Sequence, residues 1–148
     1  MIRAATPGDL AAIQEIERGS FAVVWSDAAF AAELALPQAR VDVLVDDDRV
    51  RGFASYWLVV PGAQHAAEVH ILSIATHPSH RRRGIAAQLL LHALAAGRAR
   101  GATLATLEVR RGNAPAIALY ARHGFRTVHT RTGYYQDGED GLVMLAAL

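Results

Sequence analysis

Residues 69–86 read VHILSIATHPSHRRRGIA and combine three local patterns that together decide the fold. The run from Val69 to Thr76 is apolar and rich in β-branched side chains, which is typical of a buried strand. From Ile85 to Arg100 apolar side chains recur at helical spacing, and Gly101 is a stop signal. The sequence therefore predicts a strand that leads through a short basic loop into a helix.

The basic loop has the chemistry of an anion site. Backbone N–H groups at the helix start and the positive end of the helix dipole meet three guanidinium groups, and Gly84 lets a ligand approach the backbone closely. We expect a pyrophosphate to bind here, at Arg81, Arg82, Arg83, Gly84, Ile85, Ala86 and Ala87. A solvated arginine cluster is the alternative for such a triplet taken alone. Neither the triphosphate-binding nor the dinucleotide-binding glycine motif is present in the sequence.

Length and composition limit the classes of protein that remain. The chain has 148 residues, 52% of them hydrophobic, and we expect a single domain over residues 1–148. It has no Cys, which excludes disulfides and thiol catalysis. A net charge of +1 argues against nucleic-acid binding, and the seven scattered His residues predict no metal site. The start lacks a signal peptide and no apolar run has membrane length, so we expect a cytoplasmic protein without a membrane partner.

The rest of the chain alternates strand and helix signals around the basic loop. Thr6, Ser26 and Asn113 are typical helix N-caps, and Gly124 is a typical helix end. We expect strands over 2–4, 41–45, 50–60, 68–76, 104–109, 125–130 and 142–147, and helices over 6–19, 26–37, 85–100 and 114–122. The order βααβββαβαββ predicts an α/β fold, in which a mixed sheet of six to seven strands has helices on both faces.

A second group of polar side chains follows the long helix. Glu108 is a carboxylate in an otherwise apolar strand, where alternation directs it away from Leu107 and Val109. Tyr120 lies on the next short helix, which Asn113 begins. Taken singly, these three residues also fit a solvated sheet face, a core aromatic and a simple N-cap.

The joint spacing of these residues resembles that of a known family. Arg81-x-x-Gly84-x-Ala86 is similar to the acyl-CoA loop of the GCN5-related N-acetyltransferases (GNAT). Residues 107–125 (LEVRRGNAPAIALYARHGF) and 133–144 (GYYQDGEDGLVM) resemble the ribosomal-protein-alanine N-acetyltransferase, or RimI-type, subgroup of that family. The expected element order is also that of the GNAT fold, so the resemblance covers the whole chain.

The resemblance implies a role for each matching residue. It makes Glu108 the general base and Tyr120 the general acid, and it brings Asn113 and Tyr120 into contact with the cofactor, acetyl-CoA. Substrate contacts are implied at Trp25, Tyr134 and Tyr135, and cofactor contacts at Ile74, Ala75 and Thr76. Backbone N–H groups of this last stretch can also stabilise the oxyanion of acetyl transfer.

The chain departs from the subgroup's pattern at three places. Val23-Val24-Trp25-Ser26 stands where Phe-Pro-Trp-Ser is common, and Ser73–Pro78 stands for Asn-Ile-Ala-Val-Asp-Pro. The second loop glycine is Ala86. None of these changes removes a catalytic group, but the first can alter the peptide pocket.

The resemblance implies transfer of acetyl from acetyl-CoA to a protein N-terminal amine, with the N-terminal Ala of a ribosomal protein (bS18-like) as the foremost substrate. Direct attack in a ternary complex fits the absence of Cys. An α-amine has a pKa of about 7.7–8.0 against about 10.4 for Lys, so its deprotonation at neutral pH costs roughly 3.4 kcal/mol less. The alternatives are a GNAT enzyme that acetylates a small amine or amino acid, and a non-catalytic acyl-CoA sensor. We expect a monomer or a weak dimer.

Overall fold

The expected order of strands and helices is confirmed. The computed structural model describes residues 1–21, 24–59 and 67–148. The strands are β1 (Ile2–Ala4), β2 (Ala39–Asp46), β3 (Arg49–Val59), β4 (Glu68–Thr76), β5 (Leu104–Arg110), β6 (Arg126–Arg131) and β7 (Gly141–Ala147). The helices are α1 (Leu10–Arg18), α2 (Asp27–Ala35), α3 (Ile85–Ala99) and α4 (Ala114–Arg122). Among the described helices, none is long and apolar enough to cross a membrane.

In the described residues seven strands form one mixed sheet, in the order β1-β2-β3-β4-β5-β7-β6. All neighbouring pairs are antiparallel except β4 and β5, which run parallel because α3 connects them as a crossover. The expected α/β fold with a mixed sheet is therefore confirmed, with seven strands.

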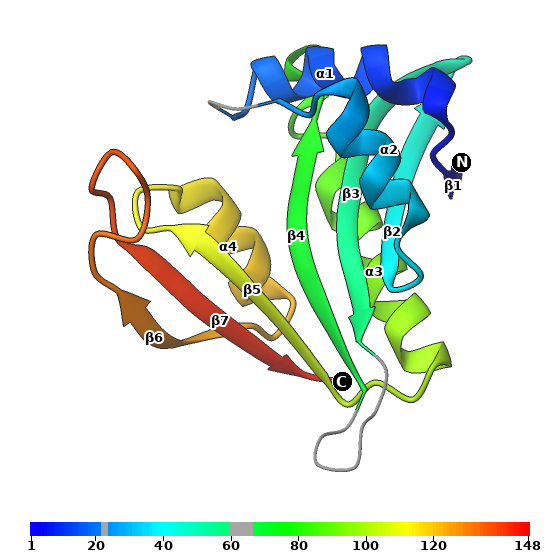
Figure 1. The fold of residues 1–148 in the computed structure, drawn as a ribbon. Coiled ribbons are helices and arrows are strands. Elements are labelled where there is room, and N and C mark those ends of the chain that lie inside the picture. The colour runs from blue at the N-terminus through cyan, green and yellow to red at the C-terminus, as the bar shows by residue number, and fades with distance from the viewer. Residues whose placement is uncertain (22–23, 60–66) are drawn as a thin grey trace.

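Helices cover both faces of the sheet, as the sequence predicts. Side chains of α1 and α2, such as Ile13 and Phe30, form one apolar cluster with β2 and β3. Side chains of α3 and α4, such as Leu89 and Tyr120, belong to a second cluster on the other face. Figure 1 shows α1 and α2 in front of the sheet and α3 behind it. The two clusters give each face its own core.

A bulge in β4 changes which side chains face each core. Ser55 pairs with Ser73 and Tyr56 with Ile71, so Leu72 has no partner in β3. One extra residue reverses the alternation of side chains. As a result Ile71 packs with the α3 side, whereas Ala75 packs with the α1 side, and Leu72 is 39% exposed.

β4 and β5 separate beyond a short paired stretch. Their pairs run only from Glu68 with Leu104 to Ile71 with Leu107, although β4 continues to Thr76 and β5 to Arg110. Figure 1 shows the two strands diverging toward one end of the sheet. The last part of β4 therefore has a free edge on the side of β5, where backbone groups remain available to a ligand.

Element ends differ from the expected ones by a few residues. The first helix begins with a 3-10 turn, Pro7–Asp9, in which the Asp9 carboxylate accepts a hydrogen bond of 2.8 Å from the N–H of Thr6. Strand β2 begins at Ala39 because Leu58 donates to the Gln38 carbonyl and extends the hairpin. The expected end of the third strand at Val60 lies outside the described residues.

Candidate functional site

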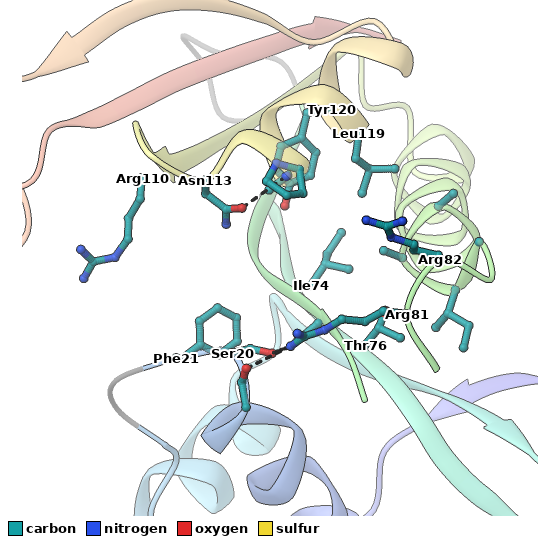
Figure 2. A pocket seen from close by; sticks show the side chains of 18 of the residues that line it. Ser20, Phe21, Ile74, Thr76, Arg81, Arg82, Arg110, Asn113, Leu119 and Tyr120 are labelled. Carbon is teal, nitrogen blue, oxygen red and sulfur yellow. Dashed lines mark hydrogen bonds between the residues drawn. The ribbon is translucent and has the colours of Figure 1, made fainter. Parts of the chain in front are cut away.

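A pocket of about 880 Å³ opens where β4 and β5 diverge. Its walls come from the free part of β4, the start of α3, the turn after β5, helix α4 and the end of α1. Eleven of the twelve expected cofactor residues line it: Ile74, Ala75, Thr76, Arg81, Arg82, Gly84, Ile85, Ala86, Ala87, Asn113 and Tyr120. Figure 2 shows Tyr120 and Asn113 across the pocket from Arg81 and Ser20.

The start of α3 has the geometry of an anion site. Gly84 is the residue before the helix and takes a φ of +75°, a left-handed conformation that favours glycine. The first helical bond runs from the N–H of Gln88 to the Gly84 carbonyl, so the preceding amides of the first turn are left for a ligand. A Cβ placed on Gly84 has no protein atom within 4 Å, so it would project into open space at a residue that lines the pocket.

The three arginines of the loop have different surroundings. Arg82 lines the pocket and has a φ of +63°, which is uncommon for a side chain with a Cβ. Arg81 also lines it, but one of its Nη atoms donates to the Gly19 carbonyl at 2.9 Å and to Ser20 Oγ at 3.3 Å. Arg83 is not among the lining residues. The loop therefore presents two of its three guanidinium groups to the pocket.

Tyr120 combines the positions of a core residue and of a pocket residue. Its ring packs 5.7 Å from that of Phe125, and only 7% of the residue is exposed, yet it lines the pocket. Burial, and secondarily the negative charge available to Tyr135, raises the pKa of Tyr120 to about 12. The hydroxyl therefore remains protonated, and able to donate, throughout the neutral range.

Asn113 serves as the N-cap of α4. Its Oδ1 accepts a hydrogen bond of 3.3 Å from the N–H of Ala116. Asn113 is therefore a helix N-cap, as its position in the sequence suggested, and this role leaves its amide nitrogen available to donate to a ligand.

Glu108 lies on the opposite face of the sheet from Tyr120. Its strand neighbours Leu107 and Val109 are buried in the α3 and α4 core, so alternation directs Glu108 to the other side. There it lies 3.6 Å from the guanidinium of Arg131. The hydrogen bond to Glu108, and the charge of that carboxylate, raise the pKa of Tyr134. Arg131 also lies over the Tyr134 ring, 5.4 Å from its centroid, so Glu108 and Tyr134 have this guanidinium as a common neighbour.

The other two expected substrate residues have clear packing roles. Trp25 packs its ring on Phe30, with 5.3 Å between the ring centroids, and its backbone N–H donates to the buried Glu17 carboxylate at 3.1 Å. Burial raises the pKa of Glu17, and the hydrogen bond from Trp25 opposes that rise. Tyr135 lies under the guanidinium of Arg110, 4.1 Å from its ring centroid. Val23, the start of the departure before Trp25, lies outside the described residues.

Several lining residues were not found from the sequence. They are Gly19, Ser20, Phe21, Arg110, Gly112, Pro115, Ala116, Leu119, Arg122 and Glu139. The three that follow α1 carry no local signal, because only the packing of the α1 end on the loop at Arg81 brings them to the pocket. Pro115 to Arg122 belong to the helix that Asn113 begins, so their position follows from that of the helix. For Glu139 the acidic sequence 139–140 after the tyrosines is a signal, but its partners are not evident from the sequence.

Comparison with known sequences fits this geometry. The profile described as "Acetyltransferase (GNAT) family" matches residues 10–125, which is most of the chain. The chain belongs to the GNAT family. The resemblance found in the sequence is confirmed, and the GNAT protein is an acetyl-CoA-dependent N-acetyltransferase.

Relatives of this GNAT protein cover nearly its whole length. It is 34% identical to the ribosomal protein bS18-alanine N-acetyltransferase of Salmonella typhimurium, over 92% of this chain and 89% of the relative. The crystal structure of the ribosomal-protein-S18-alanine N-acetyltransferase from Escherichia coli has a TM-score of 0.85 at 31% identity, and the match covers 99% and 92% of the two chains. The NatC complex bound to Gag peptide and CoA is 17% identical with a TM-score of 0.84, over 100% and 98% of the two chains, which shows the same fold.

The described residues of this GNAT domain contain no group of three or more His, Cys, Asp or Glu that could hold a metal ion. The titratable groups that line the pocket are instead Tyr120, Glu139 and four arginines, Arg81, Arg82, Arg110 and Arg122. These suit proton transfer, hydrogen bonding and anion binding.

Proposed function

We propose that this enzyme acetylates the N-terminal α-amine of a protein, with the N-terminal alanine of ribosomal protein bS18 as its foremost substrate. The observation that carries the proposal is the placement of Glu108 with Tyr134 on one face of the sheet and of Tyr120 in the pocket on the other. Between them the sheet is open, because β4 and β5 separate beyond Ile71 and Leu107. An amine from one face can therefore meet a thioester from the other.

Acetyl-CoA supplies the activated acetyl group as a thioester. The pocket residues fit this co-substrate because the glycine before α3, the free first-turn amides and Arg82 form a cradle for a pyrophosphate. Asn113 lies on the opposite wall, where its side-chain nitrogen can donate a hydrogen bond. We assign these residues to cofactor binding.

Glu108 is assigned as the general base. It is a carboxylate on the α1 face, partly exposed, and held between Arg131 and Tyr134. In this position it can accept a proton from the attacking amine, directly or through a water molecule. The residues assigned to peptide binding are Trp25, Tyr134 and Tyr135. The main support is that Glu108, the assigned base, acts on Tyr134.

Backbone donors and Tyr120 handle the charge that develops during transfer. The stretch Ile74–Thr76 lies beyond the last pair between β4 and β5. Backbone N–H groups of this stretch that face β5 can therefore donate to the carbonyl oxygen of the thioester as it becomes negative. The protonated hydroxyl of Tyr120 can donate to the departing sulfur. Glu108 and Tyr120 thus act on different atoms of the same step.

The chemistry of the base favours an α-amine over Lys. The α-amine is already partly neutral near pH 7.5, because its pKa is about 7.7–8.0, whereas Lys has a pKa of about 10.4. A carboxylate is a weak base, so it is better matched to deprotonating an α-amine than a Lys side chain. The bacterial relatives named above acetylate an N-terminal alanine, which supports the same choice here.

Turnover of a peptide panel tests this proposal. Peptides that begin with Ala, Ser, Met and Lys share one sequence after the first residue, and free amino acids and polyamines are included. We expect the Ala peptide to have the highest kcat/KM. Faster turnover of a small amine would replace the proposal with the small-molecule alternative. Tight acetyl-CoA binding without turnover of any amine would indicate a sensor.

A further inference from the structure

The loop between β6 and β7 contacts the acetyl-CoA pocket as well as the catalytic base. It spans residues 132–140 and carries Tyr134 and Tyr135 followed by Asp137, Glu139 and Asp140. The N–H of Arg111 donates to the Asp140 carbonyl at 3.0 Å, so the loop is attached to the end of β5. Figure 1 shows the loop before β7 beside that end of β5.

Glu139 is the closest link between this loop and the pocket. Its Oε2 accepts a hydrogen bond of 2.9 Å from the N–H of Gly112, and its Oε1 accepts one of 2.9 Å from Arg110 Nη1. A Cβ on Gly112 would lie 2.6 Å from Oε2, so a side chain at this position would displace the Glu139 carboxylate. Gly112, Asn113 and Glu139 all line the pocket.

The other side of Glu139 leads to the tyrosines. Arg110, which Glu139 binds, lies over the ring of Tyr135 at 4.1 Å, and Tyr135 packs on Tyr134 with ring centroids 5.1 Å apart. Arg131 lies over the Tyr134 ring, 5.4 Å from its centroid, and its guanidinium lies 3.6 Å from the Glu108 carboxylate. Contacts therefore run without a break from the turn at Gly112 to the base.

We propose that Glu139 is a positioning residue that couples acetyl-CoA binding to peptide binding, by holding the Gly112 turn and the tyrosine loop in one arrangement. This inference rests on the proposed function, since it takes the tyrosine loop as part of the peptide site. When Asn113 and its turn bind the cofactor, Glu139 and Arg110 fix Tyr135 and Tyr134 beside Glu108.

A purely structural role does not explain the arrangement as well. The side chains of Arg110 and Glu139 are 38% and 32% exposed, and partly exposed ion pairs add little to folding stability. A carboxylate that accepts two hydrogen bonds, one from a pocket amide and one from a guanidinium, does fix geometry. The expected effect of removing Glu139 is therefore on binding and coupling more than on unfolding.

The test is the peptide dissociation constant of the full chain, measured with and without saturating CoA, for the parent and for Glu139→Gln. CoA is unreactive, so it reports coupling without turnover. In the parent we expect CoA to tighten the binding of an Ala-starting peptide at least about fivefold, and in the variant less than about twofold. Steady-state kinetics of the variant should show a peptide KM raised about fivefold or more, with kcat at saturation within about threefold.

Asp137→Asn is the matched control. Asp137 also binds Arg110 Nη1, at 2.8 Å, but it is 63% exposed and does not line the pocket. Its substitution removes a charge from the same guanidinium and leaves the contact to Gly112 intact, so we expect the parent's coupling. A second variant, Gly112→Ala, introduces a methyl group at the Glu139 carboxylate and should lose coupling with no change in charge.

Several results would overturn the inference. They are full coupling in Glu139→Gln, no coupling in the parent, or equal loss of coupling in Asp137→Asn. Failure of any peptide to bind the parent would instead refute the proposed function. In that case the part of the inference that concerns the Gly112 turn is tested by acetyl-CoA binding alone. An acetyl-CoA dissociation constant that is the same in the parent and in Glu139→Gln would contradict it.

Discussion

Removal of the Tyr120 hydroxyl tests the assignment of the acid. Tyr120→Phe keeps the ring that packs on Phe125, so the fold should persist with a Tm within about 3 °C of the parent. What is lost is the donor to the departing sulfur. Because the pKa of Tyr120 is raised to about 12, this donor is present at every pH at which the enzyme would be assayed.

The same pKa limits the size of the effect. A thiol such as that of Cys has a pKa of about 8.5, well below that of Tyr120, so full proton transfer from Tyr120 to a free thiolate is uphill. The hydroxyl therefore acts mainly as a hydrogen-bond donor to developing charge. We expect the variant to lose about 10²-fold in kcat, which is about 2.7 kcal/mol, near the lower end of general acid effects.

The assay is acetyl-CoA consumption with an Ala-starting peptide, across pH 6.5–9.5, together with acetyl-CoA binding by calorimetry. Binding should change little, since the lost group acts on the transition state. The ratio of parent to variant kcat should not vary with pH, because Tyr120 does not titrate in this range. A variant with turnover within threefold of the parent would show that Tyr120 is only a core aromatic.

Three further substitutions test separate parts of the account. Gly84→Val forces a branched side chain into a left-handed φ of +75° and into ligand space, so calorimetry should show an acetyl-CoA dissociation constant raised more than about tenfold; unchanged binding by a folded variant would refute the cradle. Glu108→Gln should leave acetyl-CoA affinity unchanged but lower peptide turnover about 10²-fold near neutral pH, with a smaller loss at high pH where the amine is already neutral; a pH-independent loss would argue against a base. Asp9→Asn removes a carboxyl whose pKa is about 2, against 3.8 in the unfolded chain, chiefly because Arg3 donates a hydrogen bond to it. The stabilisation from ionised Asp9 is present above pH 3.8 and is lost as pH falls through about 2. Urea unfolding should therefore show that the variant has a free energy of unfolding about 1–2 kcal/mol below that of the parent at pH 7, after allowance for solvent screening, and that this difference shrinks toward pH 2. A difference that does not vary with pH would contradict this.

Local patterns made much of the fold predictable from the sequence. Apolar alternation in β5 and helical spacing in α3 follow directly from what each element buries. The helix start at Gly84 was predictable too, since a glycine between an apolar strand pattern and a helical pattern marks the turn between them. Each of these features depends on residues that are neighbours in the chain.

Features that depend on contacts between distant residues were not predictable. Nothing in the sequence of β4 marks Leu72 as a bulge, which only its pairing with β3 reveals. The pocket wall at Ser20 arises because Arg81 binds the end of α1, 61 residues away in the chain. The link between Gly112 and Glu139 spans 27 residues and requires the packed loop before β7. Single-sequence patterns carry no such information.

The central claim is that the accepted group is a protein α-amine. Two peptides of one sequence, each beginning with Ala and containing one internal Lys, test it most directly when one is free and the other blocked at its N-terminus. The enzyme has no Lys, so any acetyl-lysine that is detected belongs to the peptide. With acetyl-CoA near pH 7.5, mass spectrometry should show acetylation of the free peptide at its first residue, with at most a few per cent of that rate on Lys of either peptide. Lys acetylation that equals or exceeds acetylation of the α-amine would contradict the claim and leave only the broader assignment as an N-acetyltransferase.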